Sequence, residues 1–210
     1  MRAIFLSRDG VINEQRADHV KAWEEFRFLP GTLSALRWLH LAGFHIFVVT
    51  NQPIASCGIA SAQVIEDINA RMALQVSLHG GYIHASAYCP HDAEEHCQCR
   101  APRPGMLLQL AAQWHVDLSR SYLVGSTWAD IAAGRAANCR CILVGAGREP
   151  ELPGPSDARQ HPVDYITSDL PGAVDWIFCR EGLTSPHREI TIALRRPAIV
   201  NWRAALALGA

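Results

Sequence analysis

Residues 31–51, GTLSALRWLHLAGFHIFVVTN, decide the fold class of this chain. From Gly31 to Ala42 the apolar side chains recur at helical spacing, and Gly43 is a typical helix end. The apolar run His45–Thr50 follows at once and has the pattern of a buried strand. A helix followed directly by a buried strand is the unit from which parallel, helix-covered sheets are built.

The same alternation continues along most of the chain. Apolar runs predict further strands at Ala3–Leu6, Tyr82–Tyr88, Tyr122–Val124, Cys141–Val144 and Tyr165–Ile166. Helical spacing predicts further helices at Ser61–Leu78, Pro104–His115, Trp128–Ala137 and Leu170–Phe178. With right-handed crossovers between strands, this order predicts an α/β fold with a doubly wound parallel sheet over residues 1–180.

Two other segments depart from this pattern. A loop rich in proline and glycine is expected at Arg148–Pro162. Residues 181–210 change in character and are expected to form a C-terminal arm, partly helical near Trp202–Leu208. The apolar side chains of the arm would form a protein-partner site if they were exposed together, and not if they packed back on the domain.

Composition limits the classes of function. The 210 residues are 49% hydrophobic, and the formal net charge of -1 gives no broad basic face for a nucleic acid. No apolar run reaches the length of a membrane span, and residues 1–10 lack the pattern of a secretory signal. We therefore expect a cytoplasmic globular protein with neither nucleic-acid nor membrane partners.

Four metal-binding side chains crowd into one short loop. Cys89, His91, Cys97 and Cys99 supply three thiolates and one imidazole, which fill a tetrahedral zinc shell without an open position. Such a closed shell is typical of a structural site, so residues 89–99 are a predicted zinc-binding loop. His96 is placed outside the shell because it directly precedes a ligand. The other cysteines are interpreted as small apolar side chains: Cys57, Cys139, Cys141 and Cys179.

Polar residues follow four of the predicted strands. They are Ser7 to Asp9, Thr50 and Asn51, the Cys/His loop with Arg100, and Ser126 to Asp130. Ligands of doubly wound sheets bind at the carboxyl ends of the strands, so we expect these residues to form one site.

Five motifs carry a family resemblance. They are FLSRDGVIN at 5–13, VVTNQ at 48–52, the Cys-Pro-His…Cys-x-Cys-Arg loop at 89–100, PGM at 104–106 and YLVG…AD at 122–130. Together they resemble the haloacid dehalogenase superfamily, and within it the zinc-containing heptose 1,7-bisphosphate and histidinol-phosphate phosphatases. The resemblance covers about residues 3–178 and implies a phosphosugar substrate and a role in carbohydrate metabolism.

The resemblance also implies a mechanism. An Asp that ends the first strand attacks phosphorus, and a second Asp two residues later acts as acid and base. Magnesium is held by the nucleophile, a backbone carbonyl and an Asp after the fourth strand, and a Lys neutralises charge. Five positions here match this pattern. They are Asp9 as acid/base, Thr50 and Asn51 as phosphate ligands, Arg100 for substrate recognition, and Asp130 as the second acid of the fourth motif.

Three positions depart from the family pattern. The nucleophile position holds Ser7, the lysine position holds Ala101, and the first acid of the fourth motif is Ser126. The chain's only lysine is Lys21, in the loop before the first helix, and Arg103 would restore some positive charge. The site loses its nucleophile and two anionic ligands of magnesium, which predicts a pseudophosphatase with doubtful magnesium binding.

Three functional hypotheses follow. The first is a binding or regulatory protein that holds a phosphorylated small molecule through Thr50, Asn51, Arg100 and Arg103. The second is a scaffold or subunit that acts through the C-terminal arm from Thr184. The third is a weakly active phosphatase in which water or Ser7 attacks directly and Asp9 acts as the base. Five of the site residues also have a purely structural reading: Thr50 and Asn51 as strand-end caps, Asp9 as a turn residue, and Arg100 and Arg103 as solvated loop side chains.

Overall fold

The apolar runs form one parallel sheet in the part of the chain that the computed structural model describes, residues 1–145 and 162–185. The strand order is β3-β2-β1-β4-β5-β6, with every pairing parallel. This confirms the predicted α/β fold class. The strands are β1 Ala3–Ser7, β2 His45–Asn51, β3 Ala85–Cys89, β4 Tyr122–Gly125, β5 Arg140–Val144 and β6 Tyr165–Thr167.

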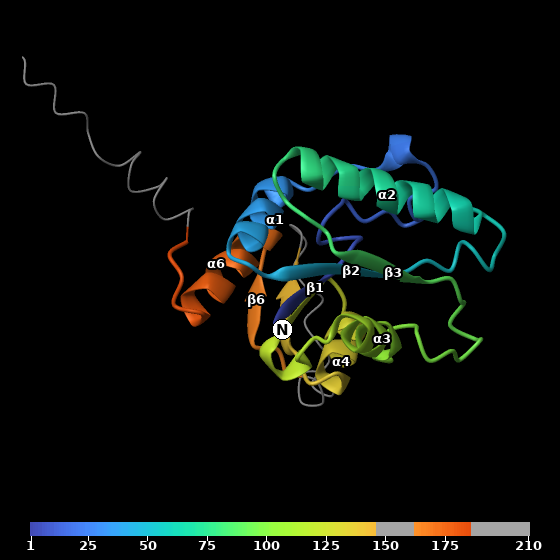
Figure 1. Cartoon of the computed structure of the whole chain (residues 1–210). Helices are drawn as coiled ribbons and strands as arrows, with labels where there is room; N and C mark the ends of the chain where they lie inside the picture. Colours follow the sequence, from blue (N-terminus) through green and yellow to red (C-terminus); the bar gives the residue numbers. More distant parts are fainter. Residues whose placement is uncertain (146–161, 186–210) are drawn as a thin grey trace, which may run out of the picture.

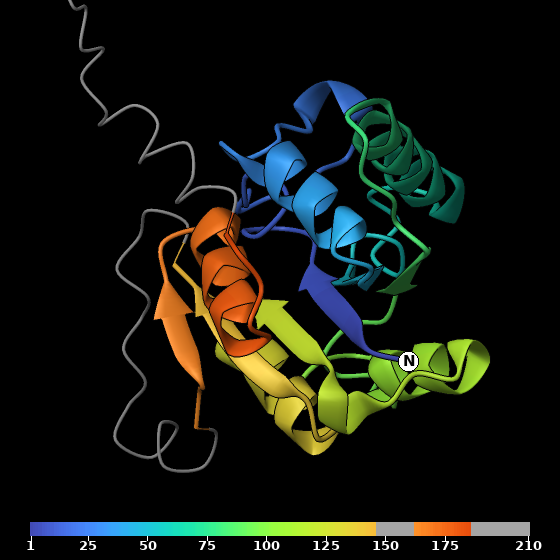
Figure 2. The same ribbon diagram turned by 60° about the vertical axis from the view of Figure 1, so that its left-hand side comes forward.

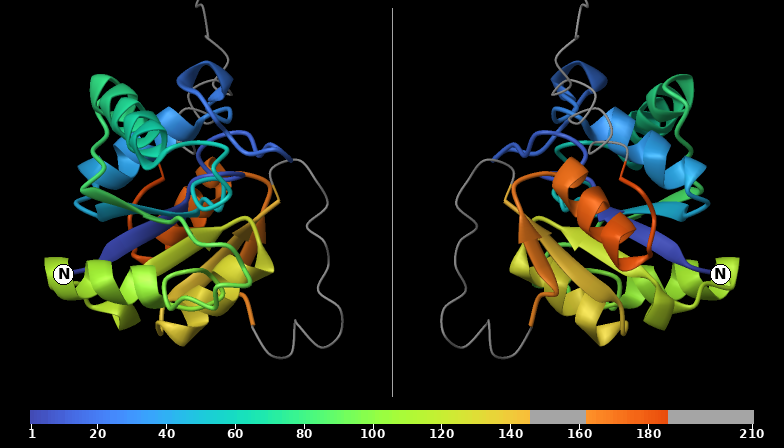
Figure 3. Two further views of the ribbon diagram at one scale, coloured as in Figure 1. Left: turned by 90° about the vertical axis from the view of Figure 1, so that its right-hand side faces the viewer. Right: turned by 90° about the vertical axis from the view of Figure 1, so that its left-hand side faces the viewer.

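Helices cover both faces of the sheet (Figure 1). They are α1 Thr32–Leu41, α2 Ala62–Leu78, α3 Gly105–Trp114, α4 Trp128–Ala136 and α6 Leu170–Arg180, with short 3-10 turns at Trp23–Glu25 and Leu118–Arg120. The helices α1, α2 and α6 share one apolar core with Ile4 and Leu6 of β1. Phe5, between them, points to the opposite core, which α3 and α4 complete. Figures 2 and 3 show these two layers of helices from other sides.

The first three residues of the strand predicted at Tyr82–Tyr88 lie outside β3. The backbone N–H of His84 donates to the carbonyl of Ile46 at 2.8 Å. The N–H of Ile46 donates in return to Nδ1 of the His84 ring at 3.1 Å. An imidazole therefore takes the place of a backbone acceptor at this end of the ladder, and β3 begins only at Ala85. The other predicted elements match the structure to within about two residues, as is usual for element ends.

The ring of His84 makes the stability of the fold sensitive to pH. Its pKa lies below the ordinary value because burial, and then the neighbouring rings of His45 and His40, disfavour the charged form. A histidine in the unfolded chain has a pKa of about 6.5. The stabilisation by neutral His84 is therefore complete above that pH and is lost as the pH falls through the lowered pKa of the folded state. We expect His84→Gln to reduce the loss of thermal stability between about pH 7 and about pH 5, because an amide oxygen accepts the Ile46 N–H without titrating. Thermal unfolding at both pH values measures this, and an unchanged pH dependence would contradict it.

The end of α6 is attached to the body of the domain. Glu181 follows this helix and bonds Arg2 and the hydroxyl of Tyr122, while Ser185 bonds Asp175. Residues 181–185 of the predicted arm therefore pack on the domain. The rest of the arm, from residue 186, and nearly all of the loop predicted at Arg148–Pro162 lie outside the described residues. Within the described part of the chain, no helix is long and apolar enough to cross a membrane.

Candidate functional site

The four predicted metal ligands come together in space. Sγ of Cys89, Cys97 and Cys99 and a ring nitrogen of His91 all lie within 4.8 Å of one another. The three sulfurs are 3.3–3.5 Å apart, and Nδ1 of His91 is 3.2 Å from Sγ of Cys99. No disulfide joins these thiols. A tetrahedral zinc ion with Zn–S bonds of about 2.3 Å would hold its sulfurs roughly 3.8 Å apart, which is slightly more than the separations here. The four groups could therefore hold a metal ion after a small outward shift of the sulfurs.

The sheet fixes one of these ligands. Cys89 is the last residue of β3 and is buried, and this burial raises the pKa of its thiol to about 12. A metal cation is the group that stabilises a thiolate in such surroundings. The backbone N–H of Arg100 donates to Sγ of Cys97 at 3.4 Å and orders the far side of the loop. His96 is not part of the cluster.

The cysteines outside the cluster divide into two kinds. Cys139 and Cys141 are buried, as predicted for small apolar side chains. The prediction is wrong for Cys57 and Cys179, which are exposed. Cys57 lies in the turns after β2, and Cys179 lies in the last turn of α6, where neither faces a core.

One cavity lies between the carboxyl end of β2, the strand β4, the helices α3 and α4, and the segment after the Cys/His loop. Its empty space, including open solvent at the mouth, is about 290 Å³. Predicted site residues therefore lie together, although Arg100 is not among them and donates instead to the His91 carbonyl at 3.0 Å. The cavity is lined by Val49, Thr50, Asn51, Ala101, Arg103, Met106, Leu107, Leu123, Asp130 and Ala133.

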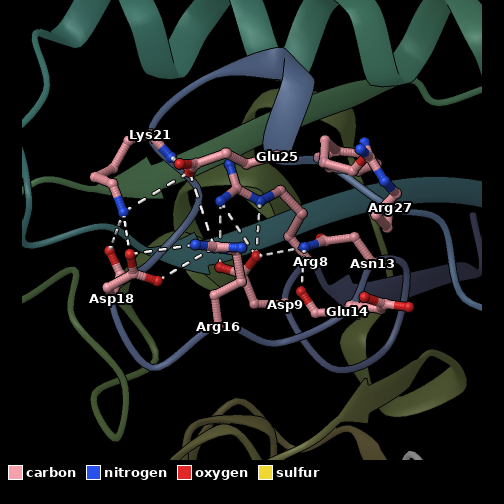
Figure 4. A network of polar contacts seen from close by, with 10 residues as sticks. Arg8, Asp9, Asn13, Glu14, Arg16, Asp18, Lys21, Glu25 and Arg27 are labelled. Carbon is pink, nitrogen blue, oxygen red and sulfur yellow. Dashed lines mark hydrogen bonds and ion pairs between the residues drawn. The ribbon is translucent and has the colours of Figure 1, made fainter.

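Asp9 lies beside this cavity with both carboxylate oxygens engaged. Oδ1 accepts from Nδ2 of Asn13 at 2.8 Å, and Oδ2 accepts from Nε2 of Gln52 at 2.8 Å. The guanidinium of Arg8 adds contacts at 3.2–3.3 Å to both oxygens (Figure 4). Only 18% of the Asp9 side chain is exposed. Its carboxylate is thus held rigidly by neighbouring donors.

Arg8 is fully buried, which the sequence analysis did not predict. Its Nη1 donates to Oδ1 of Asn69 on α2 at 3.2 Å, and Asp9 is its ion-pair partner. Removing one member of a buried ion pair generally costs about 3–5 kcal/mol, because the other charge is left uncompensated. The only signal in the sequence was a charged residue placed directly after the apolar run of β1. Gln52 and Asn69 carried no such signal.

Ser126 contacts the same turn from the end of β4. Its hydroxyl donates to the backbone carbonyl of Asp9 at 2.8 Å. The next residue, Gly10, has φ +81°, and a Cβ there would lie 2.7 Å from Oγ of Ser126. The two segments are therefore packed so closely that only glycine fits at position 10.

Asp130 lies in the first turn of α4 and takes part in the cap of this helix. Its Oδ2 accepts from the backbone N–H groups of Ser126 and Thr127, both at 3.1 Å, and from the Thr127 hydroxyl at 2.9 Å. With Thr127 it forms a reciprocal capping box. Desolvation raises the pKa of the half-buried Asp130 carboxyl, against hydrogen bonds from Thr127 and Ser7 that lower it. The spacing Thr-x-x-Asp was a readable signal for this cap, and the sequence analysis missed it.

The chain is similar to hydrolases of known family. Residues 98–173 match the HAD-hydrolase-like family. The D-glycero-beta-D-manno-heptose-1,7-bisphosphate 7-phosphatase of Pseudomonas aeruginosa is 37% identical over 145 residues, which are 69% of this chain and 82% of that protein. The chain belongs to the heptose 1,7-bisphosphate phosphatase family of HAD-like hydrolases.

Two further relatives agree with this assignment. The D-glycero-alpha-D-manno-heptose-1,7-bisphosphate 7-phosphatase of Mycobacterium tuberculosis is 35% identical over 150 residues, 68% of this chain and 78% of that protein. The crystal structure of the D,D-heptose 1,7-bisphosphate phosphatase of B. bronchiseptica, complexed with magnesium and phosphate, aligns with a TM-score of 0.76 and 30% identity. That alignment covers 86% of this chain and 99% of that one.

Of the three departures of the chain from the family pattern, Ser7 and Ser126 contact Asp130, and Ala101 lines the same cavity as Asp130. Ser7 is buried at the end of β1 and bonds Asp130, while Ala101 lines the cavity. Asn51 accepts from the N–H of Ala101 at 3.2 Å and donates to its carbonyl at 3.4 Å. Thr50 accepts from Nε2 of Gln52 at 2.8 Å.

The only lysine does not fill the lysine position of the family. Nζ of Lys21 pairs with Asp18 and Glu25, and Arg16 joins the same cluster (Figure 4). Hydrogen bonds from Lys21 and then Arg16 lower the pKa of Asp18 to about 2, which marks a solvated ion-pair cluster. Lys21 is thus committed to its own loop.

Magnesium, which the family resemblance implies, does not fit the residues present. Hard divalent cations need anionic oxygens, and both carboxylate ligands that the resemblance implies are replaced by serine, at positions 7 and 126. The Asp9 carbonyl already accepts the Ser126 hydroxyl, and Oδ2 of Asp130 accepts three donors. No catalytic step through magnesium is therefore derived for this chain.

Proposed function

We propose that this heptose bisphosphate phosphatase relative is a pseudophosphatase that binds a phosphorylated small molecule and acts as a regulatory or structural subunit. The observation that carries the proposal is the side chain at the nucleophile position. Ser7 presents a hydroxyl where the family uses a carboxylate, and a phosphoserine does not hydrolyse as an acyl phosphate does. The neighbouring positions, Ala101 and Ser126, remove the charges that would support any replacement chemistry.

The contact between Asp130 and Ser7 favours residual activity. Asp130 accepts a hydrogen bond from Ser7, and its raised pKa makes it a stronger base than an ordinary carboxylate. Its Oδ2 is nevertheless engaged by the cap of α4. The second candidate function, a weakly active phosphatase with an altered mechanism, rests on this pair.

The metal that we propose for the Cys/His cluster is zinc. Three thiolates and one imidazole match the ligand preferences of zinc, and a four-ligand shell leaves no position for substrate. Its role would be to order residues 89–103, which carry Ala101 and Arg103 to the cavity. A cytoplasmic location and a protein partner bound through the C-terminal arm stay predictions.

A phosphate-release assay tests the loss of catalysis. We expect the zinc-loaded protein, given heptose 1,7-bisphosphate and excess magnesium, to release no more phosphate than its Asp9→Asn variant. The Bordetella relative, assayed in parallel, shows that substrate and conditions are adequate, and thermal unfolding shows that both variants are folded.

Turnover would decide between the two candidates. Release that vanishes in Ser7→Ala, with a covalent phosphate on Ser7 seen by intact mass, would establish the serine route. Release that survives Ser7→Ala and vanishes in Asp9→Asn would establish direct attack by water. Either result would refute the pseudophosphatase proposal.

A further inference from the structure

Both carboxylates at the site are already bound by donors of the protein. Asp9 accepts from Arg8, Asn13 and Gln52. Asp130 accepts from two backbone N–H groups and a hydroxyl through one oxygen. A divalent cation would have to displace these donors before it gained an anionic ligand, and magnesium also gives up its own water reluctantly.

The third oxygen at this point is the backbone carbonyl of Asp9. The hydroxyl of Ser126 donates to it at 2.8 Å, so the positive end of an O–H dipole lies at this carbonyl. The same hydroxyl fixes the turn after β1 against the turn after β4. This cross-link holds the two turns together without a metal ion.

The lining of the cavity holds one cation, Arg103, in addition to the carboxylate of Asp130. Nη1 of Arg103 donates to the Cys97 carbonyl at 2.6 Å, which leaves the other N–H groups of this guanidinium for a ligand. No ion pair between Arg103 and a carboxylate occurs among residues 1–145 and 162–185. The Thr50 hydroxyl accepts from Gln52, so its own hydrogen is available to donate. A guanidinium and a hydroxyl that line the same cavity suit the oxygens of a phosphate group.

We propose that this pocket binds a phosphate group without any divalent cation, because the Ser126 hydroxyl takes the structural place of a metal ion between the two turns. The ligand class is a phosphate dianion, either inorganic or part of a sugar phosphate. This inference rests on the proposed function and specifies how the ligand of that site is held. Arg103 supplies the positive charge, and Thr50 supplies a neutral donor.

Isothermal titration calorimetry with inorganic phosphate, and separately with a hexose 6-phosphate, tests the proposal on zinc-loaded protein. We expect the same dissociation constant in magnesium-free buffer and in millimolar magnesium. Arg103→Gln should weaken binding about tenfold or more, since it removes a charged hydrogen bond. Arg120→Gln, an exposed control on the turn before β4, should leave binding unchanged. The tighter of the two probes identifies the source of the phosphate.

A variant in which phosphate binding should become dependent on magnesium completes the test. Ser126→Asp removes the hydroxyl and adds a carboxylate, so it should weaken phosphate binding without magnesium and recover it with magnesium. Wild-type binding that tightens with magnesium, or that is undetectable with both probes, would overturn the inference. Neither result bears on turnover, whereas phosphate release in the enzymatic assay would refute the proposed function by itself.

Discussion

Ser7→Asp, Ala101→Lys and Ser126→Asp, introduced together, are expected to raise magnesium-dependent phosphate release at least about a thousandfold over the background of the wild-type chain. The first change supplies a carboxylate that forms an acyl phosphate, and the third supplies an anionic ligand for magnesium. The second places an ammonium in the cavity, whose apolar wall, with Met106 and Leu107, suits the stem of a lysine. Steady-state phosphate release from heptose 1,7-bisphosphate measures the gain.

The intermediate variants make this prediction specific. Ser7→Asp alone should stay near background, because it adds a second carboxylate beside Asp130 without any cation to balance it. The triple variant that also carries Asp9→Asn should lose the gain. Full activity in Ser7→Asp alone would show that Ala101 and Ser126 are tolerated. An inactive but folded triple variant would show that the pocket has changed beyond these three positions.

Loss of one cluster ligand is expected to have the largest effect on stability. Cys99→Ala leaves three ligands, and structural zinc contributes on the order of 10 kcal/mol of binding free energy to its folded domain. Even if only part of this binding free energy stabilises the wild-type fold, its loss should lower the melting temperature by more than about 10 °C. Metal analysis should give one zinc per wild-type chain and much less in the variant.

Cys179→Ala is the matched control, since this exposed thiol lies on α6 and outside the cluster. It should leave both zinc content and melting temperature unchanged. A Cys99→Ala protein that melts with the wild type would contradict a structural metal at this site. A wild-type protein that carries no metal and melts at the same temperature after incubation with zinc would contradict it as well.

Much of the fold could be predicted because its signals are local. The buried runs of β1, β2, β4 and β5 are too apolar for any other environment, and glycine and capping residues mark the helix ends. The Cys/His cluster could be predicted from spacing alone because all four ligands lie on one loop. The start of β3 could not, since it depends on a side-chain acceptor, His84, meeting the backbone of β2.

The sequence indicates which residues form the site, but it does not indicate the contacts between them. Sequence motifs indicate that Ser126 and Asp9 approach each other, but not that the hydroxyl of one binds the carbonyl of the other. Likewise, the motifs allow Asp130 to be a metal ligand and the Thr-x-x-Asp spacing allows it to be a helix cap, and the distances to Thr127 decide for the cap. Such contacts are set by separations of less than an ångström between segments far apart in the chain.

The buried Arg8 has a consequence for the evolution of this chain. The guanidinium of Arg8 has no exposed surface, so the folded state needs Asp9 as its ion-pair partner. Selection for a stable protein alone is therefore enough to retain that aspartate. Under the proposed loss of turnover, the aspartate that the family resemblance assigns to acid/base catalysis would persist here for a structural reason. The presence of Asp9 by itself is therefore no proof of phosphatase activity in this chain.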